Sequence, residues 1–189
     1  MKDLILIIDM QNAYEKGMPW ECHSIERTKK NVMRLLETGV DAVFTAFLPP
    51  SDPDGAWKEC NAVNREINEN EWANEIIPEL SPYLSRHRVF NKSRYSSLSA
   101  PGLRELVGSY DRVVVTGVVA ECCVLATVFS LVDAGIPFVY LQDAVSGLCR
   151  ESENEAKSIV SYMIPVHGSI MNVDEYICSI SDDLGVNKL

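Results

Sequence analysis

The chain has 189 residues, of which 47% are hydrophobic and 23% are charged, and its formal net charge is −10. A chain of this length buries one substantial core, so we expect one domain over 1–189. The acidic balance argues against nucleic acid as a partner, because binding to a phosphate backbone requires clustered Lys and Arg. No apolar run is long enough for a secretory or membrane-spanning segment, so we expect a cytoplasmic protein without a membrane partner.

Apolar runs rich in β-branched residues alternate along the chain with segments of helical periodicity. The strands are expected at 4–8, 41–47, 112–118 and 136–142, with a weaker strand at 88–91. The helices are expected at 24–39, 121–135 and 150–163, the first two closed by a glycine. Strands that are apolar on both faces predict an α/β fold. We expect a three-layer sandwich, in which a doubly wound, mainly parallel sheet of about six strands carries helices on both faces.

The stretch 48–82 is less regular than the rest of the chain. It begins with a turn-rich loop, PPSDPDGAW, and continues as short polar helical pieces. An excursion of this length in a compact domain usually covers an active site or forms part of an interface.

The six cysteines do not form a metal-binding or disulfide pattern. They stand at Cys22, Cys60, Cys122, Cys123, Cys149 and Cys178 without a C-x-x-C pair, and the three histidines lie far apart in the sequence. In a cytoplasmic protein these cysteines are reduced thiols. We therefore expect no metal site and no cofactor.

Polar residues follow the predicted strands at their carboxyl ends, where open parallel sheets bind ligands. Asp9 follows 4–8, Lys92 follows 88–91, Cys122 and Cys123 follow 112–118, and Asp143 follows 136–142. Each has a structural explanation of its own: a helix cap for the aspartates, a surface charge for Lys92, and core packing for the cysteines. Together they supply a base, a cation and a nucleophile.

The two cysteines stand at the expected start of a helix. A thiolate is favoured there by the helix dipole and by nearby cations. No capping side chain precedes the helix, since its lead-in is Val118, Val119 and Ala120, and its first amides are therefore available to bind an oxyanion. Helical periodicity does not choose between Cys122 and Cys123.

Three motifs in this order resemble the isochorismatase-like superfamily of cysteine hydrolases, which includes nicotinamidases and related amidases. They are IIDMQN (7–12), FNKSRYSSL (90–98) and TGVVAECCVLAT (116–127). The resemblance implies a catalytic triad of Asp9, Lys92 and Cys123, with Cys122 in the core. It also implies that Asp143 is structural and that Gln11 positions the first loop. Family members are commonly dimers or larger, so a homodimer or larger homo-oligomer is expected.

The mechanism that this resemblance implies is acyl transfer through a thioester. Asp9 accepts the thiol proton and later passes a proton to the leaving amine, while Lys92 holds the pair and lowers the pKa of the thiol. The resemblance also implies a cis peptide between Val118 and Val119, which is expected to turn the amides of Val119 and Cys123 toward one point, where they form the oxyanion hole.

The chain departs from the nicotinamidases of this family in the segment after the second strand. Those enzymes carry an Asp and two His residues there, which bind a metal. Here the segment is TAFLPPSDPDGAW, with Phe47 and Pro49 at the expected ligand positions and no histidine nearby. A metal-independent enzyme is therefore expected. We expect the pocket wall to come from these side chains: Gln11, Tyr14, Phe47, Trp57 and Tyr95.

The leading interpretation is an amidase that acts on a small carboxamide through a thioester. Three alternatives remain open. The first is vinyl-ether hydrolysis of isochorismate, the second a catalytically silent interaction module, and the third a thiol redox protein that uses Cys122 and Cys123. Adjacent cysteines form a strained disulfide, which disfavours the third.

Overall fold

The computed structural model describes residues 1–186, so the last three residues of the expected domain 1–189 lie outside the described part. Its centre is a six-stranded sheet with the order β3-β2-β1-β4-β5-β6, in which every neighbouring pair is parallel. The strands are β1 (Asp3–Ile8), β2 (Ala42–Phe47), β3 (Val89–Lys92), β4 (Arg112–Val118), β5 (Phe138–Ser146) and β6 (Gly168–Met171). The order reverses between β1 and β4, so the expected doubly wound sheet is confirmed.

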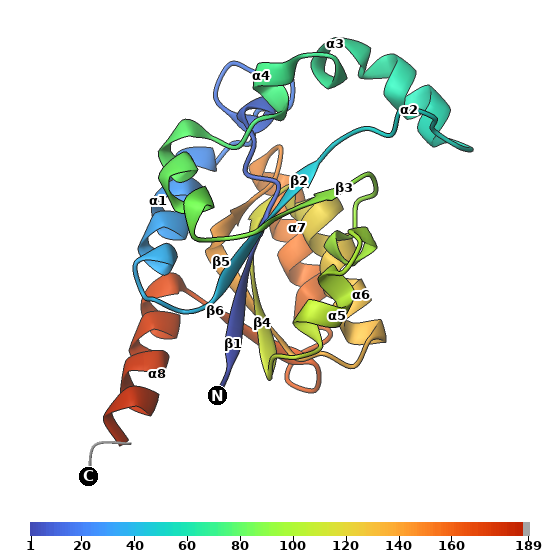
Figure 1. Ribbon diagram of the computed structural model, residues 1–189. Helices are drawn as coiled ribbons and strands as arrows, with labels where there is room; N and C mark the ends of the chain where they lie inside the picture. The colour runs from blue at the N-terminus through green and yellow to red at the C-terminus, as the bar shows by residue number, and fades with distance from the viewer. Residues whose placement is uncertain (187–189) are drawn as a thin grey trace.

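Helices cover both faces of this sheet and complete the predicted sandwich (Figure 1). One layer holds α1 (Ile25–Leu36) and α8 (Val173–Val186), together with the 3-10 segment η2 (Pro78–Ser85). The opposite layer holds α5 (Leu103–Val107), α6 (Leu125–Asp133) and α7 (Arg150–Ser161). None of the described helices is long and apolar enough to span a membrane.

The two helical layers explain why the central strands are apolar on both faces. Ile5 and Ile7 pack into the core under α1 and α8, whereas Leu4, Leu6 and Ile8 pack into the core under α5, α6 and α7. All six residues of β1 are buried. A continuous apolar run is the sequence signature of such a strand.

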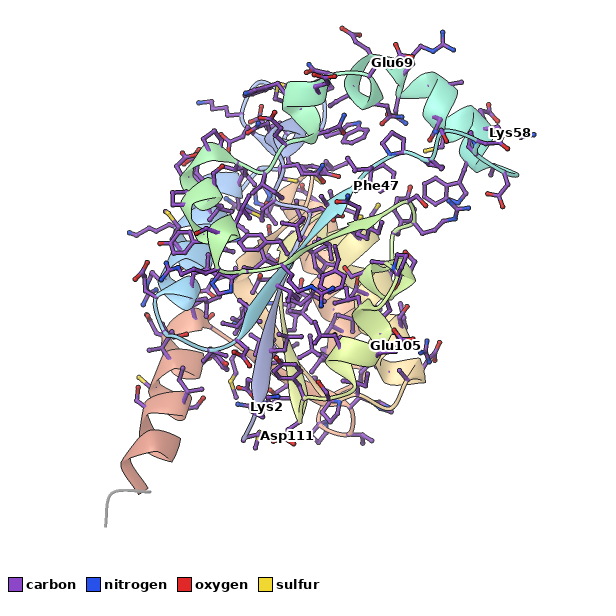
Figure 2. All side chains as sticks on the ribbon, in the orientation of Figure 1. Lys2, Phe47, Lys58, Glu69, Glu105 and Asp111 are labelled. Atoms are coloured by element: carbon purple, nitrogen blue, oxygen red, sulfur yellow. The ribbon has the colours of Figure 1, made fainter. Side chains whose placement is uncertain are left out.

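The amino ends of β1 and β4 are joined by a partly buried ion pair. Arg112 of β4 donates to both oxygens of Asp3 in β1, at 2.7 and 2.9 Å, and Tyr176 of α8 donates to the same carboxylate at 2.8 Å. Lys2 and Asp111 lie at this end, far from Phe47 at the other end of the sheet (Figure 2). The pairing of Asp3 fixes β1, β4 and α8 at the end opposite the catalytic candidates.

One strand, two α-helices and one strand boundary differ from the expectation. The strand β6 and the helices α5 and α8 were not predicted. β6 and α5 are too short to show a period, whereas α8 has 14 residues and was missed. Strand β5 continues to Ser146, so Asp143 lies within it rather than after it. The Asp143 carboxylate accepts the backbone N–H of Val173 at 2.9 Å and so caps α8, which removes Asp143 from the candidate site.

The excursion 48–82 folds into short helices above the carboxyl end of the sheet (Figure 1). They are α2 (Trp57–Val63), α3 (Arg65–Asn68), α4 (Glu71–Asn74) and the beginning of η2. The segment after β1 anchors them: the Asn12 side chain donates to the Trp72 carbonyl at 2.8 Å, and Gln11 pairs with Ile76 in an isolated antiparallel bridge. The excursion therefore lies over the strand ends.

Candidate active site

Asp9 lies immediately after β1, where the chain leaves the sheet. Its φ of 50° is in the left-handed region, which aspartate tolerates better than most residues. The Thr45 hydroxyl of β2 donates to Asp9 Oδ1 at 2.8 Å, and the Asp9 N–H donates to the Thr45 carbonyl at 3.1 Å. Neighbouring strands thus fix both the backbone and the side chain of this fully buried carboxylate.

Lys92 is the last residue of β3 and contacts both of the other predicted catalytic residues. Its Nζ lies 2.6 Å from Asp9 Oδ2, and both side chains are 0% exposed. The same nitrogen donates to Cys123 Sγ at 3.4 Å and to the Arg94 carbonyl at 3.0 Å. Lys92 is therefore paired by charge with Asp9 and donates hydrogen bonds to the other two groups. These contacts hold Lys92 between the carboxylate and the thiol, below the ring of Phe47 at 5.4 Å.

Cys123 lies on η4 (Ala120–Val124), a π-helical turn that joins β4 to α6. The Val124 N–H donates to the Val119 carbonyl at 3.1 Å, the wide spacing that defines such a turn. Thr127 of α6 donates its hydroxyl proton to the Cys123 carbonyl at 2.7 Å. The side chain of Cys123 is thereby directed toward Lys92.

The approach to this turn depends on Gly117 in β4. Its φ is +103°, and a Cβ atom there would lie 2.1 Å from the Ile8 carbonyl oxygen. Only glycine fits that position. The close contact brings the carboxyl end of β4 beside that of β1, and so brings Cys123 near Asp9.

The peptide between Val118 and Val119 is cis, as expected from the resemblance. Val119 also lines the cavity above Cys123. Among the hydrogen bonds of residues 1–186, none is donated by the Val119 N–H. This amide is available to a ligand.

The pKa of the Cys123 thiol is raised well above its usual value, although Lys92 itself acts to lower it, as expected. Burial is the largest cause, since Cys123 is only 4% exposed, and the Asp9 carboxylate is the next. Lys92 opposes both effects without overcoming them. The resting thiol therefore keeps its proton beside a carboxylate that can accept it.

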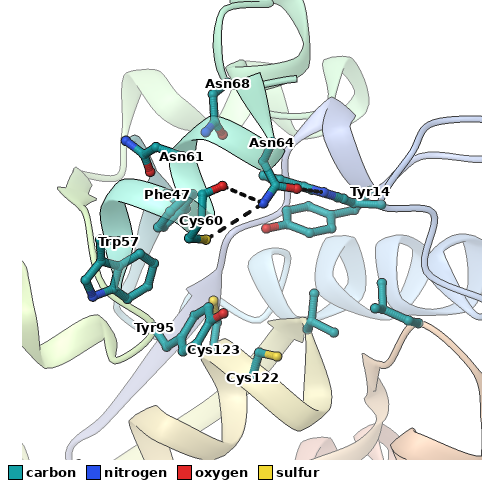
Figure 3. Close-up of a pocket in the computed structure, with 13 residues that line it drawn as sticks. Tyr14, Phe47, Trp57, Cys60, Asn61, Asn64, Asn68, Tyr95, Cys122 and Cys123 are labelled. Carbon is teal, nitrogen blue, oxygen red and sulfur yellow. Dashed lines mark hydrogen bonds between the residues drawn. The ribbon is translucent and has the colours of Figure 1, made fainter. Parts of the chain in front are cut away.

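A cavity of about 210 Å³ opens above Cys123. Five aromatic rings in successive contact form its wall, with centroid distances between neighbouring rings of 5.6, 6.5, 6.2 and 5.1 Å. In order, the rings belong to Tyr14, Trp20, Phe47, Trp57 and Tyr95. Figure 3 shows Cys122 and Cys123 below the cavity and three asparagines of the excursion above it.

Four of the five side chains expected in the pocket wall line this cavity, and Gln11 does not. The buried Gln11 amide donates to the carbonyls of Phe47 and Asn74, at 3.0 and 2.8 Å, and accepts the Phe47 N–H at 2.8 Å. Gln11 therefore ties the first loop to β2 and to α4. Cys122, expected in the core, is partly buried: it packs against the core cluster and also lines the cavity.

Sequence reasoning missed other cavity residues: Trp20, Cys60, Asn61, Asn64, Asn68 and Leu148. Among these residues, only the asparagines show a sequence pattern that could have identified them. They are spaced by three and four residues, which places them on one face of a helical segment. The direction of that face follows from the tertiary anchoring of the excursion, not from its local sequence.

The polarity of the cavity limits what it can bind. None of the side chains that line it belongs to Lys, Arg, Asp or Glu. Burial is the main cause that raises the pKa of Tyr14 well above its usual value, with Cys123 and Asp9 adding to it, so its hydroxyl keeps its proton. The cavity suits an uncharged ligand with a flat or apolar body.

The residues near the cavity do not fit a metal ion. Within residues 1–186, no group of three or more His, Cys, Asp or Glu side chains could hold one. Phe47, at one of the positions where the resemblance led us to look for ligands, packs between the rings of Trp20 and Trp57. We therefore assign no step to a metal.

The sequence model of the isochorismatase domain family matches residues 3–168 of this chain. A cysteine hydrolase from Pseudomonas syringae pv. phaseolicola 1448A has a similar fold, with a TM-score of 0.83 and 17% identity over 96% of this chain and 93% of that chain. For nicotinamidase PncA from Bacillus subtilis the TM-score is 0.74, with 19% identity over 91% of this chain and 100% of that one. For pyrazinamidase of Pyrococcus horikoshii, solved in complex with zinc, the TM-score is 0.68, with 19% identity over 91% of this chain and 99% of that chain. No curated protein matches the chain significantly.

Proposed function

Because the chain belongs to the isochorismatase family, we propose that it is a cysteine hydrolase that cleaves the C–N bond of a small, uncharged carboxamide. The observation that carries this proposal is the position of Lys92 Nζ, 2.6 Å from Asp9 and 3.4 Å from Cys123, beneath an aromatic cavity. A base, a cation and a nucleophile in contact are the parts that acyl transfer requires.

The first half of the reaction forms a thioester. Asp9 takes the proton of the Cys123 thiol as the sulfur attacks the amide carbon, and negative charge develops on the carbonyl oxygen. The N–H groups of Val119 and Cys123 bind that oxygen. One such donor contributes roughly 2.7–4 kcal/mol of transition-state stabilisation. The C–N bond then breaks, and the nitrogen takes the proton from Asp9 and leaves as ammonia.

The second half releases the acid. Water attacks the thioester carbon while Asp9 takes one of its protons, and the C–S bond breaks as that proton returns to sulfur. Lys92 stabilises the thiolate that forms during each half, because it already donates to the sulfur at 3.4 Å. Its contacts to Asp9 and to the Arg94 carbonyl keep it in that position.

Three observations favour this function over its alternatives. Isochorismate carries two carboxylates, and the cavity lining offers no cationic side chain to pair with them. A silent interaction module has no need of a fully buried pair of Asp9 and Lys92 against a cysteine. A redox role would use Cys122 and Cys123, yet the Cys123 thiol accepts a hydrogen bond from Lys92, and the Asp9 carboxylate raises its pKa, as expected beside a nucleophile.

The proposal is tested by screening uncharged primary carboxamides for the release of ammonia. The wild type is expected to hydrolyse at least one of them, and Cys123→Ala to lose at least about 10³-fold in kcat/KM, because it removes the nucleophile. Cys178→Ala, at an exposed position of α8, is the matched control and should retain full activity. Undiminished hydrolysis by Cys123→Ala would overturn the assignment.

A further inference from the structure

The cavity has a polar roof opposite its catalytic floor. Asn61 belongs to α2, Asn68 belongs to α3, and Asn64 stands between the two helices. All three line the cavity and lie across it from Cys123 (Figure 3). They are the polar amides of an otherwise aromatic and thiol-lined space.

Asn64 is already fully engaged within the protein. Its Oδ1 accepts the indole N–H of Trp20 at 3.1 Å, and its Nδ2 donates to the Cys60 carbonyl at 2.8 Å. This pair of bonds ties the roof to the loop that carries Trp20. Asn64 therefore holds the roof in place and has little capacity left for a ligand.

Asn61 and Asn68 differ from Asn64 in having a free acceptor. The Asn61 Nδ2 donates to the Pro50 carbonyl at 3.2 Å, which fixes the orientation of the amide and directs its Oδ1 elsewhere. That oxygen is buried without a hydrogen-bond partner, and so is Oδ1 of Asn68. Buried polar atoms are normally paired, and an unpaired one is destabilising.

We propose that the oxygens of Asn61 and Asn68 accept hydrogen bonds from the end of the substrate that is remote from the scissile amide. The substrate is then an uncharged carboxamide whose flat body lies between the aromatic rings and whose far end carries N–H donors. This inference rests on the proposed function, because it takes Cys123 to mark the reacting end. Two acceptor oxygens also repel a carboxylate, so an acidic far end is disfavoured.

The proposal is tested with pairs of substrates that differ in one donor. The amino group and the methyl group are similar in size, so 3- and 4-aminobenzamide are compared with 3- and 4-methylbenzamide. The wild type should favour at least one amino compound over its methyl partner by about tenfold in kcat/KM, as expected for one buried hydrogen bond. A ratio near one for both pairs would overturn the inference while leaving the amidase assignment intact.

Variants identify the residues responsible. Asn61→Leu and Asn68→Leu keep the size of the side chain and remove the acceptor, so at least one of them should bring the ratio close to one. Asn61→Asp and Asn68→Asp keep an acceptor oxygen and should preserve the preference. Asn154→Leu, at an exposed position of α7 outside this cavity, is the matched control. An unchanged ratio in both leucine variants would contradict the proposal.

A binding measurement separates this inference from the proposed function. Cys123→Ala should bind 3- or 4-aminobenzamide about tenfold more tightly than its methyl partner, which is followed by the fluorescence of Trp20 and Trp57 in the cavity wall. If no carboxamide is hydrolysed but this preference is present, the proposed function is wrong, and the inference that Asn61 and Asn68 bind a donor group is supported. Equal binding of the amino and methyl compounds would contradict the proposed role of Asn61 and Asn68, whatever the enzyme hydrolyses.

Discussion

Asp9 raises the pKa of the thiol that it is proposed to deprotonate. The two roles are compatible, because a carboxylate disfavours a neighbouring thiolate by charge but is also the nearest proton acceptor. The thiol stays protonated at rest and loses its proton only as sulfur attacks. Lys92, in contact with both groups, limits the cost of that transfer.

Replacing Asp9 by Asn separates these roles. The carboxylate charge that raises the pKa of Cys123 is lost and the Lys92 charge is left unbalanced, so the thiol should ionise at a lower pH. Hydrolysis should nevertheless fall by at least about 10³-fold, since the proton acceptor is gone. The pH dependence of Cys123 alkylation, measured with the exposed Cys149 and Cys178 replaced by Ser, reports the ionisation.

Lys92→Met should shift the pH dependence of Cys123 alkylation in the opposite direction from Asp9→Asn. Lys92 lowers the pKa of Cys123, so its removal should shift alkylation of Cys123 to still higher pH. Shifts of both variants in the same direction would show that the charges of Asp9 and Lys92 do not act on this thiol as described.

The choice of Cys123 over Cys122 as the proposed nucleophile shows the limit of sequence reasoning at this scale. Helical periodicity could not choose between Cys122 and Cys123, and only the family resemblance favoured Cys123. The structure gives the reason: residues 120–124 form a π-helical turn, whose hydrogen bonds and side-chain directions do not follow the α-helical period. The raised pKa of Cys123 was likewise not predictable, because it depends on burial.

Among the elements, β4 makes the contact that positions the catalytic turn. Gly117→Ala would place a Cβ 2.1 Å from the Ile8 carbonyl oxygen, at a φ of +103°. We expect it to lower the free energy of unfolding by about 3 kcal/mol or more. Gly135→Ala is the control, since Gly135 has a φ of +70° but nothing within 4 Å of the added Cβ, and it should lose about 1 kcal/mol. If urea unfolding gives the same decrease in the free energy of unfolding for both variants, the close contact of Gly117 with β1 is not the cause of the destabilisation.

The last residue of β2 contributes an aromatic ring to the cavity wall and not a metal ligand. Phe47 packs against Trp20 and Trp57, and the described residues offer no metal-binding group. We expect hydrolysis by the wild type to be unchanged after dialysis against EDTA. Loss of activity that added zinc restores would mean that metal ligands exist outside the groups identified.

Most of the long elements were predictable from their patterns, but the 14-residue helix α8 was not expected. The fully apolar runs predicted β1, β2 and β4 within one residue of their observed ends. Strand β6 and helix α5, of four and five residues, are too short to show a period. The pieces of the excursion are held by side-chain bonds to the loop after β1, which local sequence does not contain.

For the molecule as a whole, the parallel sheet accounts for the assembly of the site. Asp9, Lys92 and Cys123 come from regions far apart in the chain, and the carboxyl ends of β1, β3 and β4 bring them together. The rule that open parallel sheets bind ligands at this edge was enough to group these residues. It was not enough to exclude Asp143 or to place the asparagine roof, since both depend on how other elements pack.

The central claim is that Cys123 carries an acyl group during turnover. Its most direct test is intact-protein mass spectrometry after rapid acid quenching of the enzyme with a carboxamide that it hydrolyses. We expect a mass increase equal to the acyl group less one hydrogen, located by peptide mapping on Cys123 and absent in Cys123→Ala. Hydrolysis at the same rate with no adduct in the wild type, or with the adduct on Cys122 or Cys60, would contradict it.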